Sequence, residues 1–206
     1  MEHMFLENFK RKVIHVNNTL PAHSDIAALL PCYTSTGDCT SLLIRDGTVR
    51  LLTLRVRTAI ARLARRQATD LLSLKQACSE NTQRTNLQPL PLSAELLLFP
   101  VKIRTPRVPG DTCTGYMNYH AVKSVLPCAH NPAHATITLA GSHTVTALWR
   151  AATVTRYLQL SQLAAFAAPL TAGRIVREAT GQYHTDLTIL HKMTELQEML
   201  LKRQLR

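Results

Sequence analysis

Leu96-Leu97-Leu98-Phe99-Pro100 is an uninterrupted apolar run that ends in a proline, and Cys113-Thr114-Gly115-Tyr116 follows it after a turn. The apolar run predicts a buried strand over 95–99 that stops at Pro100, because proline has no N–H to donate to a neighbouring strand. The intervening turn contains Pro106, Pro109 and Gly110. A second strand is predicted over 113–119, so this part of the chain is expected to form two consecutive strands.

Short strands separated by turns are predicted for residues 12–50. Val13–Val16 ends at Asn17-Asn18, and Ser41–Arg45 meets Asp46-Gly47 before Val49. An Asp-Gly pair between apolar runs is a strong hairpin signal, since both central residues of a type I′ turn need positive φ. Pro31 and Gly37 are interpreted as further turns in this region.

The hydrophobic period changes to that of a helix from about Leu52 to Ala77. The apolar residues that share one face of this predicted helix are Leu52, Val56, Ile60, Leu63, Leu71 and Leu74. Gln67 interrupts the apolar stripe. Residues 79–93 are polar and contain two prolines, so a loop is predicted there.

The C-terminal half predicts a second hairpin followed by helices. Ala135–Leu139 alternates apolar and polar residues, and Ala140-Gly141 turns the chain into Thr144–Trp149. Helices are predicted from Arg150 to Ala168 and from Thr185 to Leu205.

Strands and helices are segregated along the chain, which favours an α+β fold over a doubly wound sheet. The expected architecture is a set of antiparallel hairpins in a sheet, with packed helices and a C-terminal helix. We expect residues 1–168 to form this α+β domain and residues 169–206 to form a C-terminal helical extension.

Composition and charge limit the possible partners. With 206 residues, 46% of them apolar, the chain can bury a sizeable core. Its formal net charge of +11 indicates a strongly anionic partner, such as nucleic acid or a membrane surface. No stretch approaches the roughly 18 apolar residues of a membrane span, so no membrane partner is expected. Five widely spaced cysteines without an export signal predict reduced thiols in a cytoplasm.

Two groups of arginines are candidate DNA contacts. Arg55, Arg62, Arg65 and Arg66 fall on neighbouring positions of the predicted helix, with only Asp70 near enough to neutralise them. Arg104 and Arg107 lie in the proline-framed turn, which suits entry into a narrow minor groove where negative potential attracts arginine. The alternatives are a solvated helix face whose arginine stems cover apolar surface, and an unstructured charged loop.

Metal binding and catalysis are not expected. Cys128, His130 and His134 are ligand types that suit zinc, but their spacing matches no common zinc finger because Cys-x2-Cys is absent. A nucleophile pair of Cys113 with His120, or of Cys128 with His130, would need an orienting carboxylate. Acids are scarce in that region, where Asp111 is the candidate. The sequence therefore predicts no metal, no cofactor, no catalytic residue and no enzyme activity.

The order of these segments resembles the ComK competence transcription factor family over roughly residues 12–165. Arg65-Arg66-Gln67-Ala68-Thr69 stands where the family has Gly-Arg-x-Ala-Thr, and Leu98-Phe99-Pro100 matches a strand that ends in Phe-Pro-Thr. Cys113 with Gly115-Tyr116 matches the family's Cys-x-Trp-Ile element, and Ile137–Gly141 matches its hairpin.

The chain also departs from the family pattern. Ala64 stands in place of the family's glycine, Tyr116 in place of its tryptophan and Val101 in place of its threonine. In the helix that follows, Arg156-x-x-Gln159 inverts the family's Gln-x-x-Arg. These departures concern the target sequence and the activator function more than the fold or DNA binding.

The resemblance implies a cytoplasmic, nucleoid-associated transcriptional activator of competence (DNA-uptake) genes. It implies binding to paired AT-rich boxes of double-stranded DNA through the minor groove, as a homodimer or higher homo-oligomer. It also implies control by proteolysis through an adaptor and a Clp-type ATPase. The alternative hypothesis is a basic RNA-associated or prophage-type nucleic-acid-binding protein without activator function.

Overall fold

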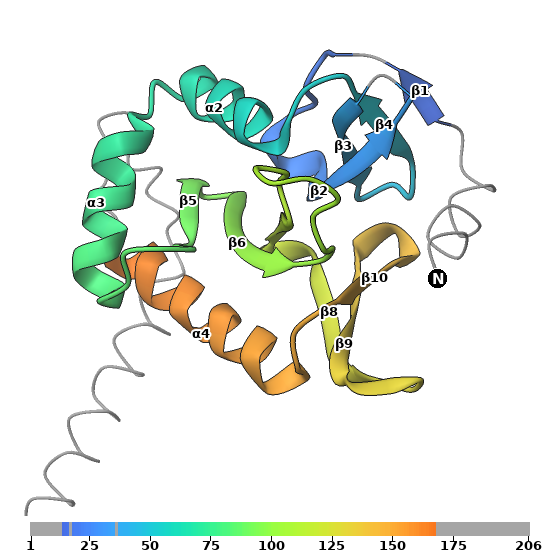
Figure 1. Ribbon diagram of the computed structural model, residues 1–206. Helices are drawn as coiled ribbons and strands as arrows, with labels where there is room; N and C mark the ends of the chain where they lie inside the picture. Colours follow the sequence, from blue (N-terminus) through green and yellow to red (C-terminus); the bar gives the residue numbers. More distant parts are fainter. Residues whose placement is uncertain (1–13, 17, 36, 168–206) are drawn as a thin grey trace, which may run out of the picture. The chain divides into compact units, whose positions relative to one another are not determined.

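The computed structural model describes residues 14–16, 18–35 and 37–167, which form two β-sheets and three α-helices (Figure 1). Both sheets contain antiparallel hairpins. In sequence, two helices lie between strands of the larger sheet, and the third follows the last strand of the smaller sheet. The predicted α+β class is confirmed. The predicted helix over 185–205 and the predicted extension over 169–206 lie outside the described residues.

The larger sheet has seven strands in the order β1-β4-β3-β2-β7-β6-β5. Their bounds are β1 Ile14–Val16, β2 Ile26–Thr34, β3 Gly37–Ile44, β4 Val49–Leu52, β5 Leu90–Ser93, β6 Leu96–Lys102 and β7 Thr114–Asn118. Neighbouring strands are antiparallel except at one edge, where β1 runs parallel to β4. The predicted hairpin at Asp46-Gly47 is confirmed, because this turn joins β3 to β4 and Gly47 has φ +98°.

The smaller sheet has three antiparallel strands in the order β10-β9-β8. Its strands are β8 Val122–Cys128, β9 Asn131–Leu139 and β10 His143–Ala147. The predicted hairpin across Ala140-Gly141 is confirmed as the connection from β9 to β10. No strand was predicted over β8, whose residues are all partly or fully exposed and give little apolar signal.

The single helix predicted from Leu52 to Ala77 is wrong. Leu52 is the last residue of β4, and two helices follow, α2 (Val56–Arg66) and α3 (Leu71–Thr82). Ala68 has φ +50°, a left-handed conformation that ends α2, and the Asp70 carboxylate caps α3 by accepting from the N–H groups of Leu72 and Ser73. Because α3 runs to Thr82, the loop predicted over 79–93 is also too long.

Pro31 lies inside β2 and Pro100 inside β6, so the turn predicted at Pro31 and the strand end predicted at Pro100 are wrong. β7 pairs with β2 only at Ala28 and Leu29, and β5 pairs with β6 only as far as Leu98. Each proline therefore lies where its strand has a paired neighbour on one side only. A missing N–H is tolerated at such an edge.

Apolar side chains are buried on both faces of the large sheet. On one face, Leu42 and Leu52 pack with Val56, Ile60 and Leu63 of α2 in a single cluster. On the other face, a second cluster joins the large sheet to the small sheet and to helix α4 (Ala151–Ala167), and its members include Phe99, Met117, Ile137, Val145 and Val154. The helix predicted over 150–168 is thus confirmed as α4. Val154 and Tyr157 in its first half belong to this second cluster, whereas Ala164 near its end belongs to the cluster of α2.

The turn between β9 and β10 packs directly on the turn between β3 and β4. A Cβ atom on Gly141 would lie 2.6 Å from the Gly47 nitrogen and 2.8 Å from the Arg45 carbonyl oxygen, and Gly141 has φ +73°. Next to this contact, the buried His143 donates from Nε2 to the carbonyl oxygen of Ile44 at 2.7 Å. Glycine at 141 is therefore what allows the two turns to pack this closely.

We predict that Gly141→Ala lowers the free energy of unfolding by about 2–4 kcal/mol, from the left-handed backbone and from the clash with the Gly47 backbone. Gly110→Ala is the matched control, because Gly110 also has positive φ (+91°) but a Cβ there would meet nothing within 4 Å. Urea unfolding of both variants measures the difference. Equal losses in the two variants would contradict the packing argument.

Candidate nucleic-acid interface

Helix α2 separates its apolar residues from its arginines. Its buried residues are Val56, Ala59, Ile60, Leu63 and Ala64. The arginines of the helix and of its N-cap are all exposed, and they are Arg55, Arg57, Arg62, Arg65 and Arg66. The helix sequence VRTAIARLARR contains no acidic residue. We call these five arginines the α2 arginine face.

The α2 arginine face has no counter-charge among the described residues. Among the described residues the ion pair joins Arg104 to Asp38, and neither of these residues belongs to α2. Asp70, the acid expected to neutralise the cluster, instead uses its carboxylate to accept from Leu72 N, Ser73 N and the Ser73 hydroxyl. These bonds, the one from the Ser73 hydroxyl first, lower the pKa of Asp70. A basic surface without counter-charge attracts polyanions.

Arg66 differs from its neighbours on α2 because it also holds the chain. Its Nη1 donates to the carbonyl oxygen of Leu20 at 2.6 Å and to that of Pro21 at 3.2 Å. Arg62 and Arg65 make no such bond within the described residues and project from the exposed side of the helix. Arg62 and Arg65 are therefore the better candidates for contact with a partner.

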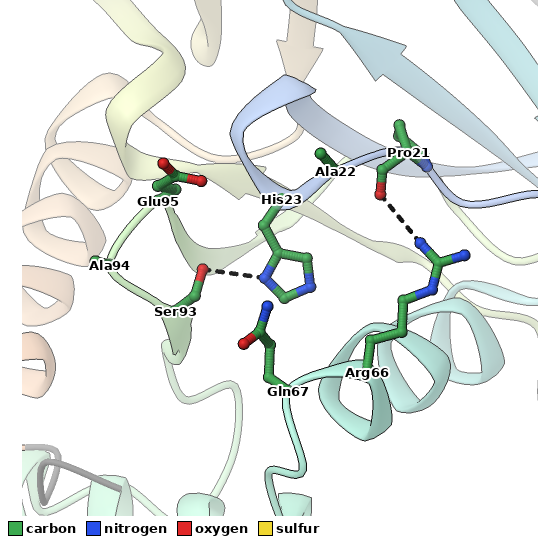
Figure 2. A pocket seen from close by; sticks show the side chains of 8 residues that line it. All are labelled: Pro21, Ala22, His23, Arg66, Gln67, Ser93, Ala94 and Glu95. Atoms are coloured by element: carbon green, nitrogen blue, oxygen red, sulfur yellow. Dashed lines mark hydrogen bonds between the residues drawn. The ribbon is translucent and has the colours of Figure 1, made fainter. Parts of the chain in front are cut away.

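A pocket of about 390 Å³ lies where the C-terminal end of α2 meets the turn between β5 and β6. Figure 2 shows His23 between Ser93 on one side and Arg66 on the other, with the Gln67 side chain below the imidazole ring. His23 is 6% exposed, and its Nδ1 is hydrogen-bonded to Ser93 Oγ at 3.0 Å. Sequence reasoning did not find this pair, because 70 residues separate its members and no motif connects them.

Burial lowers the pKa of His23 below its ordinary value of 6.5. The Leu63 backbone, in the last turn of α2, acts in the opposite direction, and the buried His23 Nε2 has no hydrogen-bond partner among the described residues. The nearby charge of Arg66 lowers the pKa further. His23 is thus a neutral, buried imidazole at neutral pH, and it ties η1 (His23–Asp25) to β5.

Arg104 and Arg107 are placed differently although they belong to the same turn. Arg104 is 13% exposed, its Nη2 lies 2.5 Å from Asp38 Oδ1 and its Nε donates to the Thr112 carbonyl oxygen at 2.7 Å. Arg107 is exposed, and its guanidinium lies 4.4 Å from the centroid of the Tyr33 ring. This placement leaves Arg104 little surface for DNA, whereas Arg107 remains accessible.

The candidate residues for metal binding and catalysis lie in three places: the small sheet, the turn before β7, and the short helix η2 (Tyr119–Ala121), which contains His120. Cys128 ends β8, His130 lies in the turn after it and His134 lies in β9. The described part of the chain contains no group of three or more His, Cys, Asp or Glu side chains that could hold a metal ion. Cys113 Sγ donates to the Asp111 carbonyl oxygen, and no hydrogen bond joins it to His120 within the same residues.

Comparison of the chain with protein-family models, with curated proteins and with solved structures finds no match. Among the described residues, no helix is both long enough and apolar enough to cross a membrane.

We predict that the free energy of unfolding falls as the pH is lowered from about 7 to about 5, because the unfolded chain then binds protons that buried His23 resists. His120, whose pKa is also lowered by burial, contributes with the same sign. The stabilisation is complete above the pKa of histidine in the unfolded chain. It is lost as the pH falls through the lower pKa of His23 in the folded protein. Urea titrations at several pH values measure this slope.

His23→Asn should flatten that pH dependence, since asparagine can keep a hydrogen bond to Ser93 but does not titrate. His130→Gln is the control, because His130 is exposed in the turn between β8 and β9. The assignment to His23 fails if its replacement leaves the slope as steep as in the unmodified protein.

Proposed function

We propose that this protein is a DNA-binding transcriptional regulator that contacts double-stranded DNA through the α2 arginine face. The observation that carries the proposal is that this face exposes five arginines on and beside one helix, without an acid in the helix and without an ion pair among the described residues. Each phosphate that such a side chain contacts releases condensed counterions, and this release drives binding.

AT-rich duplex is the preferred partner in this proposal, and the minor groove the preferred entry. Arginines outnumber asparagines and glutamines in α2, where Gln67 at the C-cap is the nearest amide side chain. Arginine-rich surfaces with few amide groups favour phosphate contact and recognition of groove width over direct reading of base edges. Narrow minor grooves in AT-rich tracts attract arginine most strongly.

The remaining parts of the proposal rest on the resemblance to the ComK family. They are activation of competence genes, assembly as a homodimer or higher homo-oligomer, association with the nucleoid in the cytoplasm and turnover through a proteolytic adaptor. No catalytic activity is proposed. The second candidate function is RNA binding without activator function, which the same arginine face and the net charge of +11 would also serve.

We predict that the chain binds phased AT-rich duplex with an affinity that falls steeply with salt, and that a minor-groove ligand competes with it. Changing Arg62 and Arg65 together to Ala should weaken binding to all duplex sequences and lower the salt slope by about two units, one for each lost phosphate contact. Lys75→Ala, on the exposed side of α3, is the control and should leave the slope unchanged. Fluorescence anisotropy at several salt concentrations measures both quantities.

Single-stranded RNA of the same length, tested at the same salt, separates the two candidate functions. Tighter binding to AT-rich duplex supports the DNA-binding regulator. If single-stranded RNA binds at least as tightly, the RNA-binding function replaces it, and the ComK-like role should be abandoned.

A further inference from the structure

A single carboxylate organises the loop between β6 and β7. One oxygen of Asp111, Oδ2, accepts from the Tyr33 hydroxyl, from the Arg107 N–H at 3.3 Å and from the Val108 N–H at 3.2 Å. The Asp111 N–H in turn donates to the Val108 carbonyl oxygen at 3.3 Å. These bonds close residues 107–111 into a compact turn, and we call residues 105–110 the β6–β7 loop tip.

The β6–β7 loop tip is anchored to the hairpin of β2 and β3 rather than left free in solvent. Tyr33 lies in β2, and its ring contacts two guanidinium groups, that of Arg104 at 3.9 Å and that of Arg107 at 4.4 Å from the ring centroid. The Tyr33 oxygen also accepts from the Arg107 N–H at 3.0 Å. Arg104 is held in turn by Asp38 of β3, so the loop has polar anchors on both hairpin strands.

The anchor is ionised at neutral pH. The hydrogen bond from Tyr33, followed by those from the Val108 and Arg107 N–H groups, lowers the pKa of Asp111. The negative charge strengthens each of the three bonds it accepts, since charge-assisted hydrogen bonds are stronger than neutral ones. With Pro106 and Pro109 limiting φ on either side, few conformations remain to be lost when a partner binds.

The loop tip presents apolar side chains beside a cation. Val108 is 58% exposed, and Pro109 and Arg107 next to it are also exposed. A single exposed apolar side chain needs no explanation. Here, however, two consecutive apolar residues, Val108 and Pro109, lie on a loop whose conformation is fixed by four polar side chains. Arg107 directly precedes them.

We propose that the β6–β7 loop tip inserts into the minor groove, with Val108 and Pro109 wedged between base pairs at a flexible pyrimidine–purine step and Arg107 against the groove wall. Apolar wedges flanked by basic residues recur in minor-groove binding, and TA steps are the easiest to unstack. Tyr33 and Asp111 are positioning residues, because they act only through the loop. This inference rests on the proposed DNA-binding function.

Strand β7, which leaves the loop, lies beside helix α2. The charge of Arg57, near the start of α2, acts on Tyr116 of β7, where it partly opposes the rise in pKa that burial causes. β7 begins three residues after Asp111. Tyr116 also packs against the apolar cluster that contains the buried side of α2, so this part of β7 lies next to the helix.

The test uses a duplex with a central TA step in which the adenine is replaced by 2-aminopurine, whose fluorescence rises when it is unstacked. The unmodified protein should raise this fluorescence. Val108→Thr, which keeps the shape of the side chain but makes it polar, should abolish the rise and weaken binding about fivefold to tenfold, with no change in the salt slope because no charge is lost. Leu126→Thr is the matched control, since Leu126 on β8 is 59% exposed.

The positioning residues are tested with Asp111→Asn and Tyr33→Phe, which remove the charge and the hydroxyl with little change in volume. Both variants should weaken binding to the TA duplex severalfold and reduce the fluorescence rise, while thermal unfolding shows that the fold persists. A variant that loses affinity only in proportion to a loss of folded protein would argue against a positioning role.

Failure of this inference can be told apart from failure of the proposed function. In one outcome the protein binds duplex, and changing Arg62 and Arg65 weakens that binding. If Val108→Thr then binds as tightly as the unmodified chain and 2-aminopurine fluorescence does not rise, the loop tip does not insert between base pairs, but the DNA-binding function stands. If the unmodified protein does not bind duplex, both proposals fail.

Discussion

Burial of both faces of the large sheet is the constraint on which the rest of the structure depends. Six consecutive residues are buried in β2 and six in β6, so apolar side chains point to both sides of these strands. One side is covered by α2, α3 and the end of α4, and the other by the small sheet and the first half of α4. Because α2 must turn its apolar residues toward the sheet, its arginines have to face the solvent.

Charged residues in this protein follow two different arrangements. Arg104 pairs with Asp38 and Tyr33 donates to Asp111, and these interactions hold the loop between β6 and β7. The α2 arginine face has no ion-pair partner in the described residues, although Arg66 donates to the carbonyl oxygens of Leu20 and Pro21. A cluster of that kind is stabilised when an anion arrives, which is why it carries the proposed function.

Buried polar groups fix how the layers meet. Asn118 is fully buried, and its side-chain amide donates to the carbonyl oxygens of Ile26 at 2.9 Å and Glu95 at 3.0 Å, while its oxygen accepts from the His120 N–H. His143 ties the small sheet to the end of β3, and His23 ties η1 to β5. An alternative packing would leave these groups without hydrogen bonds, so they favour one arrangement of the elements.

Local signals in the sequence were sufficient for the α+β class, the turn at Asp46-Gly47, the hairpin across Ala140-Gly141 and helix α4, because each depends on neighbouring residues. The arginine positions on α2 also followed from helical period.

Other features were decided only by the tertiary structure. Pro31 and Pro100 stay within strands because the next strand stops short of them, and Ala68 adopts a left-handed conformation between two packed helices. His23 meets Ser93 and Tyr33 meets Asp111 across 70 and 78 residues, and Arg104 is withdrawn from solvent while Arg107 is not. Contacts of this range depend on how the sheet layers pack, which no local pattern of residues encodes.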